Sequence, residues 1–232
     1  MPLSPEEYNK WYYTKRGKYI SGLEKEVLLR MINPPSPPFS KGGLGGILDI
    51  GCGTGYFTEF LSGFCKNIVG VDTSMDMIKY AIKKHRDSNI KYLIADAEKL
   101  PFKDGGFDIS VSITALNFVK NPLSAVSEAV RISRKKVFLG ILNRWSLLYF
   151  FKKVKSFFIN TSYSDACFYG ERDMVNILSS FPQIKGVYKQ HTYFLPFPKI
   201  HLILSKMEGS IPSWFPFGGF MGIVGEKEGR IR

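Results

Sequence analysis

The stretch ILDIGCGTGYFTEFL, residues 47–61, decides the expected fold of this 232-residue chain. Ile47, Leu48 and Ile50 form an apolar run typical of a buried parallel strand, and a glycine-dense turn then opens into a helix. Glycine stands at positions 51, 53 and 55, where the lack of a Cβ permits positive φ and lets a ligand lie against the backbone. The free N–H groups at the start of the helix would face that ligand. The stretch therefore predicts a nucleotide-like ligand between strand and helix.

The spacing of the glycines narrows the choice of ligand. A dinucleotide-binding turn has the pattern G-x-G-x-x-G, whereas Tyr56 stands where the third glycine would fall. The Gly-Lys-Ser/Thr of a P-loop is also missing from this turn. The pattern that is present, D-x-G-x-G-x-G, resembles motif I of the class I methyltransferases that use S-adenosylmethionine.

Three further stretches carry this resemblance in the family's order and spacing: VDTSMDMIKYA (71–81), IADAEKLPFKDGGFDIS (94–110) and SAVSEAVRISRKKVFLGIL (124–142). The resemblance covers roughly residues 45–145 and is strongest to the group of ubiquinone and menaquinone biosynthesis methyltransferases (methyltransferase domain type 11). It implies an α/β, Rossmann-like fold with a seven-stranded, mostly parallel sheet. An antiparallel hairpin would form the sheet edge, and helices on both faces would complete a three-layer α/β/α sandwich.

The resemblance also implies S-adenosylmethionine as the cofactor and S-adenosylhomocysteine as the product. Asp72, which follows Gly51 by 21 residues, would accept hydrogen bonds from the ribose hydroxyls, although it could also simply precede a helix capped by Thr73 or Ser74. Asp96 and Ala97 would contact the adenine. The expected cofactor-binding residues are Asp49, Gly51, Cys52, Gly53, Thr54, Gly55, Asp72, Thr73, Met77, Asp96, Ala97, Glu98, Thr114 and Asn117.

The sequence identifies no catalytic residue and no metal ligand. Methyl transfer from a sulfonium is an in-line displacement with an activated electrophile, so the protein chiefly aligns the nucleophile and excludes water. Asn117 is at best an orienting group. His191 and His201 could each serve as a general base, although a lone histidine is more often structural. We expect His85, which lies among lysines near a helix end, to be a solvated cation.

The formal net charge is +12, and residues 131–160 contain eight Lys or Arg and no carboxylate. Such a stretch can attract nucleic acid, an anionic membrane surface or an acidic substrate, whereas the simpler interpretation is a solvated face. An RNA or tRNA methyltransferase that uses this stretch is one alternative function, and it is not favoured. Peripheral membrane contact is also possible, because aromatic residues alternate with lysines after Arg144.

The cysteine content and the hydropathy of the chain indicate the cellular compartment that we expect for it. Cys52, Cys65 and Cys167 are odd in number and far apart, which argues against a disulfide framework or a C-x-x-C metal site. No run of about 18 apolar residues is free of charge, so no transmembrane segment is predicted. The N-terminus lacks the apolar region of a signal peptide. These features predict a cytoplasmic protein, and they leave its oligomeric state open.

We expect one methyltransferase domain over residues 1–232. Its parts are an N-terminal lid or helix (1–32), a Pro/Gly-rich insertion (33–46), the cofactor-binding core (47–143), and substrate-side helices with the C-terminal hairpin (144–232). The aromatic residues of the last part favour a small apolar or aromatic methyl acceptor. A protein that binds S-adenosylmethionine without turnover is a further alternative, in which the insertion has damaged the lid or the entrance.

Two local expectations concern helices. Ser21 would cap a helix that begins near Gly22. Met75, Ile78 and Ile82 would form the core face of the helix that follows Asp72.

Overall fold

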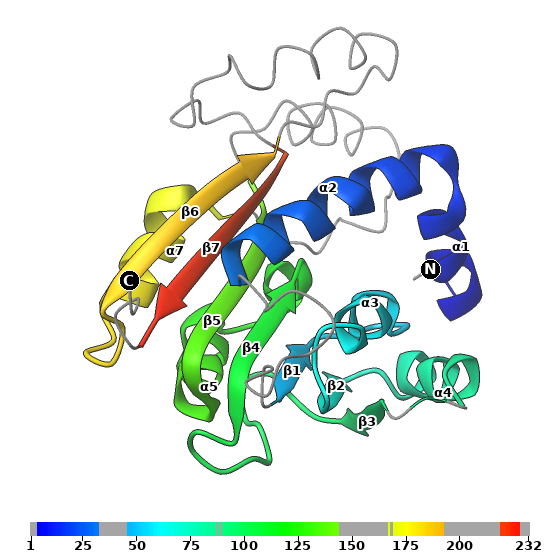
Figure 1. Cartoon of the computed structure of the whole chain (residues 1–232), viewed down its shortest axis with the longest axis horizontal. Helices are drawn as coiled ribbons and strands as arrows, with labels where there is room; N and C mark the ends of the chain where they lie inside the picture. Colours follow the sequence, from blue (N-terminus) through cyan, green and yellow to red (C-terminus); the bar gives the residue numbers. More distant parts are fainter. Residues whose placement is uncertain are drawn as a thin grey trace, which may run out of the picture.

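A computed structural model describes residues 4–32, 46–86, 88, 90–143, 167, 169–192 and 219–227. A seven-stranded sheet of order β3-β2-β1-β4-β5-β7-β6 runs through the molecule (Figure 1). Its strands are β1 (Ile47–Ile50), β2 (Ile68–Asp72), β3 (Lys91–Ile94), β4 (Phe107–Ile113), β5 (Ser133–Leu142), β6 (Gly186–Thr192) and β7 (Phe220–Glu226). The described helices are α1 (Pro5–Tyr13), α2 (Lys15–Ile32), α3 (Tyr56–Ser62), α4 (Met75–Lys84), the 3₁₀ helix η1 (Ala115–Phe118), α5 (Pro122–Ile132) and α7 (Glu171–Ser179).

Strands β1 to β5 are parallel, and β7 runs antiparallel to both β5 and β6. The expected mostly parallel sheet with an antiparallel edge is therefore confirmed. Because β6 is antiparallel to β7, it runs in the same direction as β5. The carboxyl ends of all the strands except β7 thus open at one edge of the sheet, which is where open α/β sheets bind their ligands.

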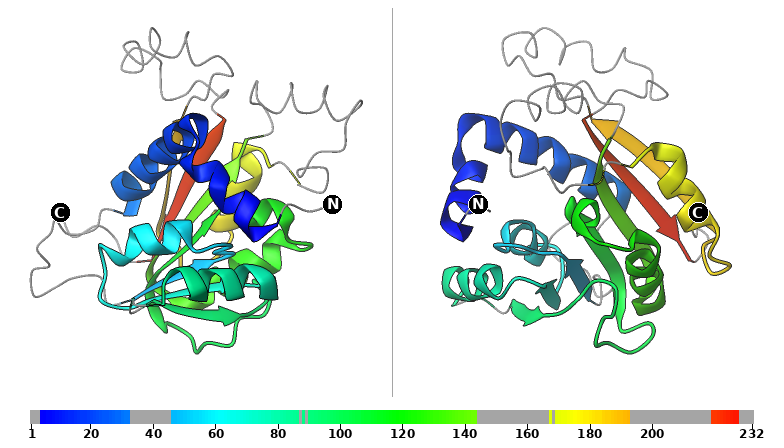
Figure 2. Two further views of the ribbon diagram at one scale, coloured as in Figure 1. Left: turned by 90° about the vertical axis from the view of Figure 1, so that its right-hand side faces the viewer. Right: turned by 180° about the vertical axis from the view of Figure 1, so that it is seen from behind.

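Helices cover both faces of the sheet, as Figures 1 and 2 show. On one face α2 packs on β5, β6 and β7, α3 on β1 and β2, and α4 on β2 and β3. On the other face α5 packs on β4 and β5, and α7 on β6 and β7. Neighbouring residues of β1 divide between the two apolar layers, since Ile47 belongs to the first and Leu48 to the second. The predicted three-layer sandwich is confirmed.

Local sequence explains where several helices begin. Ser4 and Glu7 form a capping box at α1, with Pro5 in the first helical position. The side chain of Asn121 caps α5, which also begins with a proline, and Ser74 caps α4.

Two local expectations were wrong. Helix α2 begins at Lys15, and Ser21 lies buried within it with its hydroxyl 2.9 Å from that of Tyr56. In α4 only Ile78 of the three predicted core residues is buried, because Met75 and Ile82 are 53% and 51% exposed. Most of the Pro/Gly-rich insertion, the lysine-rich aromatic segment after Asn143 and His201 lie outside the described residues.

Candidate functional site

A cavity of about 570 Å³ lies at the carboxyl edge of the sheet. Its size is in the range of small-molecule and cofactor sites. Its walls come from the turn after β1, the start of α4, the loop after β3, the end of β4 with η1, and α1. The lining residues are Tyr8, Gly51, Gly53, Asp72, Thr73, Ser74, Met77, Ala95, Asp96, Ala97, Glu98, Ile113, Thr114, Ala115, Phe118, Val119 and Lys120.

The glycine turn, residues 51–55, needs its glycines for conformation as well as for space. Gly51, Gly53 and Gly55 have φ of 74°, 52° and 78°, a region that L side chains avoid. A Cβ on Gly51 would also lie 2.1 Å from the Cβ of Ala115. The backbone N–H of Gly51 donates to the carbonyl of Val71 at 2.7 Å, which ties the turn to the end of β2. The turn is thus rigidly placed at the cavity wall.

Asp72 joins the glycine turn to the start of α4. One carboxylate oxygen accepts from the N–H of Gly53 at 2.9 Å, and the other accepts from the N–H of Ser74 at 2.9 Å. Both oxygens keep further lone pairs, and Asp72 lines the cavity. The aspartate therefore braces the turn and can still accept hydrogen bonds from a ligand.

The loop after β3 brings a second carboxylate to the cavity. Asp96 is exposed and accepts the N–H of Glu98 at 2.9 Å, which makes a tight local turn. The carboxylate of Glu98 in turn accepts the N–H of Asn121, at the start of α5, at 2.9 Å. Asp72 and Asp96, predicted from two separate motifs, thus line one cavity.

The end of β4 holds a strained residue. Thr114 has φ 59° and ψ −5°, the left-handed region that a β-branched residue rarely occupies. Its N–H donates to the carbonyl of Gly140 at 2.7 Å, which holds the chain in this conformation. The resulting turn places Thr114 and Ala115 on the cavity wall.

Five of the fourteen predicted site residues do not line this cavity: Asp49, Cys52, Thr54, Gly55 and Asn117. A Cβ on Gly55 would lie 2.4 Å from the hydroxyl oxygen of Tyr92, so this glycine faces the protein interior. Asn117 is fully buried, donates to the carbonyl of Cys167 at 2.6 Å and accepts the N–H of Leu142 at 3.2 Å. The structure therefore places Asn117 as a link between η1 and β5, outside the lining of the cavity.

Asp49, Cys52 and Thr54 border a second, much smaller cavity of about 10 Å³ beside the glycine turn. Asp49 is 2% exposed and accepts the hydroxyl of Thr58 at 2.7 Å. Burial raises the pKa of Asp49 to about 7, while the Thr58 hydrogen bond acts in the opposite direction and the charge of Asp72 adds to the rise. Within the part of the chain that the structure describes, the buried hydroxyl of Thr54 has no hydrogen-bond partner. Asp49 is thus a buried carboxyl group beside the turn whose pKa lies well above its ordinary value.

Some lining residues were not in the predicted set. The N-terminal segment was expected either to form a lid or to staple the terminus, and it does contribute Tyr8, whose ring faces Gly53. Tyr12, one turn further along α1, stacks on Tyr56 with ring centroids 3.9 Å apart. Phe118 and Val119 follow the predicted Thr114 closely in sequence, but their helical turn was not visible in the residue pattern.

The expectation for His85 was wrong. Its side chain is buried at the end of α4, with Nε2 3.1 Å from the carboxylate of Glu59 and Nδ1 2.8 Å from the hydroxyl of Tyr92. The Tyr92 ring lies behind Gly55 and Gly70, so this chain of contacts supports the glycine turn from its interior side. His191 is also paired, with Nε2 2.7 Å from Glu171.

Most of the described cations in the basic stretch, residues 131–160, are paired with carboxylates. Of its four cations within the described residues, Arg131 pairs with Glu128 and Asp104, Arg134 with Asp108, and Lys136 with Glu226. The carboxylates come from other parts of the chain, so counting residues 131–160 alone could not reveal them. No described helix is long and apolar enough to cross a membrane.

Comparison with known proteins agrees with this geometry. The profile of the family described as "Methyltransferase domain" matches residues 48–141, from β1 to β5. An uncharacterised protein of Methanocaldococcus jannaschii is 36% identical over 228 residues, which cover 96% of each chain. A demethylmenaquinone methyltransferase of Roseiflexus is 33% identical over 125 residues, 53% of this chain and 51% of that enzyme.

A solved structure from Thermotoga maritima extends the similarity to the whole fold. It is described as a SAM-dependent methyltransferase, possible histamine N-methyltransferase. It is 26% identical, with a TM-score of 0.69 and coverage of 96% of both chains. With the glycine turn, the sheet order and the family match together, the chain belongs to the class I methyltransferases and uses S-adenosylmethionine as its cofactor.

Proposed function

We propose that this enzyme methylates a small apolar or aromatic acceptor, which binds beside the cofactor at the η1 end of the cavity. The observation that carries the acceptor class is the apolar lining there: Phe118 is 50% exposed and is joined by Val119, Ile113 and Ala115. An exposed aromatic ring in a cavity wall favours a flat or apolar partner.

The cavity residues fit the parts of S-adenosylmethionine. We assign the ribose to Asp72, whose free lone pairs suit two neighbouring hydroxyls, with Thr73 and Met77 beside it. The adenine goes to Asp96, Ala97 and Glu98 in the loop after β3. Gly51 and Gly53 leave open backbone for the methionine end, and a side chain on either would be strained at its positive φ.

The five predicted residues outside the lining support the cofactor indirectly in this proposal. Cys52, Thr54 and Gly55 belong to the rigid turn, and Asp49 lies behind it. The buried carboxylate of Asp49 would become ionised next to the ammonium of the methionine end and so stabilise its charge. Asn117 fixes η1 and thereby the position of Phe118.

S-adenosylmethionine supplies a methyl group on a sulfonium, which needs no further activation. The protein's own task is to hold the acceptor in line with that group and to keep water away. Thr114 and Ala115 form the wall at this point, and Tyr8 covers the glycine turn from α1. We assign no general base.

The test is transfer of a labelled methyl group to two separate pools, a small-molecule extract and purified RNA. We expect label in organic-soluble small molecules, and less of it at the same cofactor concentration with Asp72→Ala, which removes the ribose contact. Label recovered in RNA, with binding that weakens steeply as salt rises, would contradict the proposed acceptor class. That result would favour the basic stretch, although three of its four described cations are already paired.

A further inference from the structure

The loop between β3 and β4, residues 95–106, has two sides; we call it the base loop. Its first residues, Ala95 to Glu98, line the cavity. Its later residues face α5, a helix that contributes no residue to the cavity lining. The position of Ala95 to Glu98 in the cavity wall therefore depends on the contacts that fix the later residues of the loop against α5.

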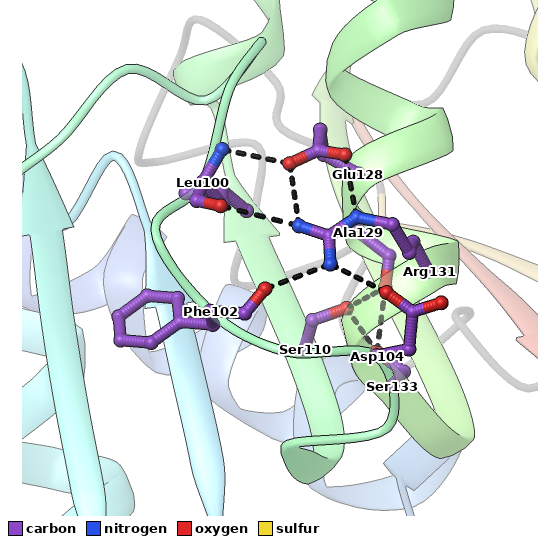
Figure 3. A network of polar contacts seen from close by, with 8 residues as sticks. All are labelled: Leu100, Phe102, Asp104, Ser110, Glu128, Ala129, Arg131 and Ser133. Atoms are coloured by element: carbon purple, nitrogen blue, oxygen red, sulfur yellow. Dashed lines mark hydrogen bonds and ion pairs between the residues drawn. The ribbon is translucent and has the colours of Figure 1, made fainter.

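A single arginine of α5 binds the later part of the base loop. The guanidinium of Arg131 donates to the carbonyl of Leu100 at 3.1 Å, the carbonyl of Phe102 at 2.7 Å and the carboxylate of Asp104 at 2.7 Å (Figure 3). These three acceptors lie along five consecutive residues of the loop. Arg131 thus fixes the path of the backbone and not merely one point on it.

Glu128, one helical turn before Arg131, completes the arrangement. Its two carboxylate oxygens accept from Nε and Nη2 of Arg131 at 2.7 and 2.8 Å, which is a paired, fork-like contact. One of these oxygens also accepts the N–H of Leu100 at 2.7 Å. Figure 3 shows Glu128 and Arg131 meeting Leu100 from both its N–H and its carbonyl. We call these two residues the α5 clamp.

The two charged groups of the α5 clamp are mutually paired and largely shielded from water. The Arg131 side chain is 30% exposed and that of Glu128 only 18%. The hydrogen bonds from Arg131 lower the pKa of Glu128, and those to Glu128 and Asp104 raise the pKa of Arg131. Each shift favours the charged form of the group, so the two members of the clamp stabilise each other's charge. Asp104, at 81% exposure, adds less because water screens it.

The α5 helix holds the loop at a second point and is itself anchored. The backbone N–H of Asn121 donates to Glu98, while the Asn121 side chain caps the helix. At the other end the hydroxyls of Ser110 and Ser133 lie 2.7 Å apart, and both lie within hydrogen-bonding distance of the carbonyl of Ala129. These contacts tie α5 to β4 and β5, so the clamp has a rigid base.

We propose that Arg131 and Glu128 are positioning residues for recognition of the cofactor's base. They hold the base loop so that Asp96 and Ala97 stay within reach of the adenine edge, although neither touches the ligand. The inference rests on the proposed placement of adenine against these two residues. Arg131 is required for its planar fork, because a lysine ammonium cannot donate to Glu128 and to three loop oxygens in one geometry.

The test compares affinities for two ligands that differ only at the base. S-adenosylhomocysteine carries a 6-amino group, and S-inosylhomocysteine carries an oxygen there, which would face the Asp96 carboxylate. We expect the wild type to prefer the adenine ligand. In Arg131→Lys and Glu128→Gln, affinity for the adenine ligand should fall about tenfold, which is about 1.4 kcal/mol, with little change for the inosine ligand. The preference should therefore shrink.

Two control variants separate this effect from general damage. Arg30→Lys disrupts another helical Arg–Glu pair, on the exposed surface of α2, and should leave both affinities unchanged. Asp72→Ala should weaken both ligands equally, because it acts at the ribose. Hydrogen exchange at the Leu100 amide should accelerate in Glu128→Gln but not in Arg30→Lys, which measures the clamp without any ligand. If Arg131→Lys does not fold, Glu128→Gln gives the same test.

The outcomes distinguish the two proposals. An unchanged preference in a folded clamp variant overturns the inference and leaves the cofactor placement intact. Equal affinity of the wild type for the two ligands also overturns the inference, because the base loop would then not distinguish adenine from hypoxanthine. If the wild type binds neither ligand, the cofactor placement fails and the inference fails with it.

Discussion

The glycine turn and the base loop lie on the same cavity but are held in place by different means. The turn is shaped mainly by its own backbone: three glycines have positive φ, and the amides of Gly51 and Cys52 bond to the carbonyl of Val71, with the Asp72 side chain adding a bond to Gly53. The base loop has a positive-φ glycine only near its end, at Gly105, and is held by side chains from α5, about 30 residues later in the chain. The conformation of the turn can be predicted from a short sequence motif. The conformation of the base loop cannot, because it depends on which helix packs beside the loop.

The largest effect should come from the turn. Gly51→Ala places a methyl group 2.1 Å from that of Ala115 and forces φ 74° on an L residue. We expect the free energy of unfolding to fall by about 2–5 kcal/mol, the sum of overpacking and left-handed strain. Chemical denaturation measures this directly.

The matched control is Gly22→Ala in α2, where a Cβ would meet no atom within 4 Å. That change should raise the free energy of unfolding by about 0.5–1 kcal/mol, because alanine is the better helix former. Equal effects of the two substitutions would show that the turn is not conformationally constrained.

Asp72→Ala tests the residue that connects the turn to the ligand. It removes acceptors for the Gly53 and Ser74 amides and for the proposed ribose hydroxyls. We expect binding of S-adenosylmethionine to weaken by about 1–3 kcal/mol in a calorimetric titration. Asp76→Ala removes the same charge four residues later on the exposed side of α4, and it should change little. If Asp72→Ala binds as well as the wild type, the ribose lies elsewhere.

Asp49 should make stability depend on pH. Its pKa is about 7 in the folded protein and about 3.8 when unperturbed, so between these values the folded state holds a proton that the unfolded state has lost. Stability should therefore fall as pH rises from about 4 to 7 and then level off. The midpoint of thermal unfolding, compared between wild type and Asp49→Asn, measures this contribution.

The comparison with Asp49→Asn is needed because Glu24 acts in the same direction. Burial raises the pKa of Glu24 to about 8. Glu24→Gln should retain the slope that Asp49→Asn removes. Wild type and Asp49→Asn with parallel pH profiles would mean that Asp49 is ionised in the folded protein throughout.

The smallest effect should come from Glu98→Gln in the base loop. The amide oxygen can still accept the N–H of Asn121, so we expect a loss of at most about 0.5 kcal/mol in the free energy of unfolding. Denaturation and titration of this variant beside Arg131→Lys would rank the two attachments. An effect as large as that of Arg131→Lys would place the main support of the loop at the start of α5.

The parts of the fold that sequence predicted were those set by local pattern. The apolar run of Ile47, Leu48 and Ile50 lies in β1, and the family resemblance carried by the glycine spacing anticipated the sheet and its antiparallel edge. Nine of the fourteen predicted site residues line one cavity, because parallel strands bring their carboxyl ends to the same edge.

The features that the sequence did not predict, such as the surroundings of His85 and Arg131, depend on residues elsewhere in the chain. His85 was expected in solvent because its neighbours are lysines, yet Glu59 and Tyr92 enclose it. Arg131 was counted as part of a basic stretch, although its carboxylates lie at positions 104 and 128. Charge counted along a segment cannot show which acids the fold brings against it. The fork of Glu128 and Arg131, three residues apart on one helix, was the available signal.

The most direct test of the account is a calorimetric titration of the purified protein with S-adenosylmethionine and, in parallel, with NAD. The glycine spacing and the carboxylates Asp72 and Asp96 predict that S-adenosylmethionine binds at one site and that NAD does not bind. Binding of NAD, or of neither compound, would contradict the assignment of this cavity to the methyl donor.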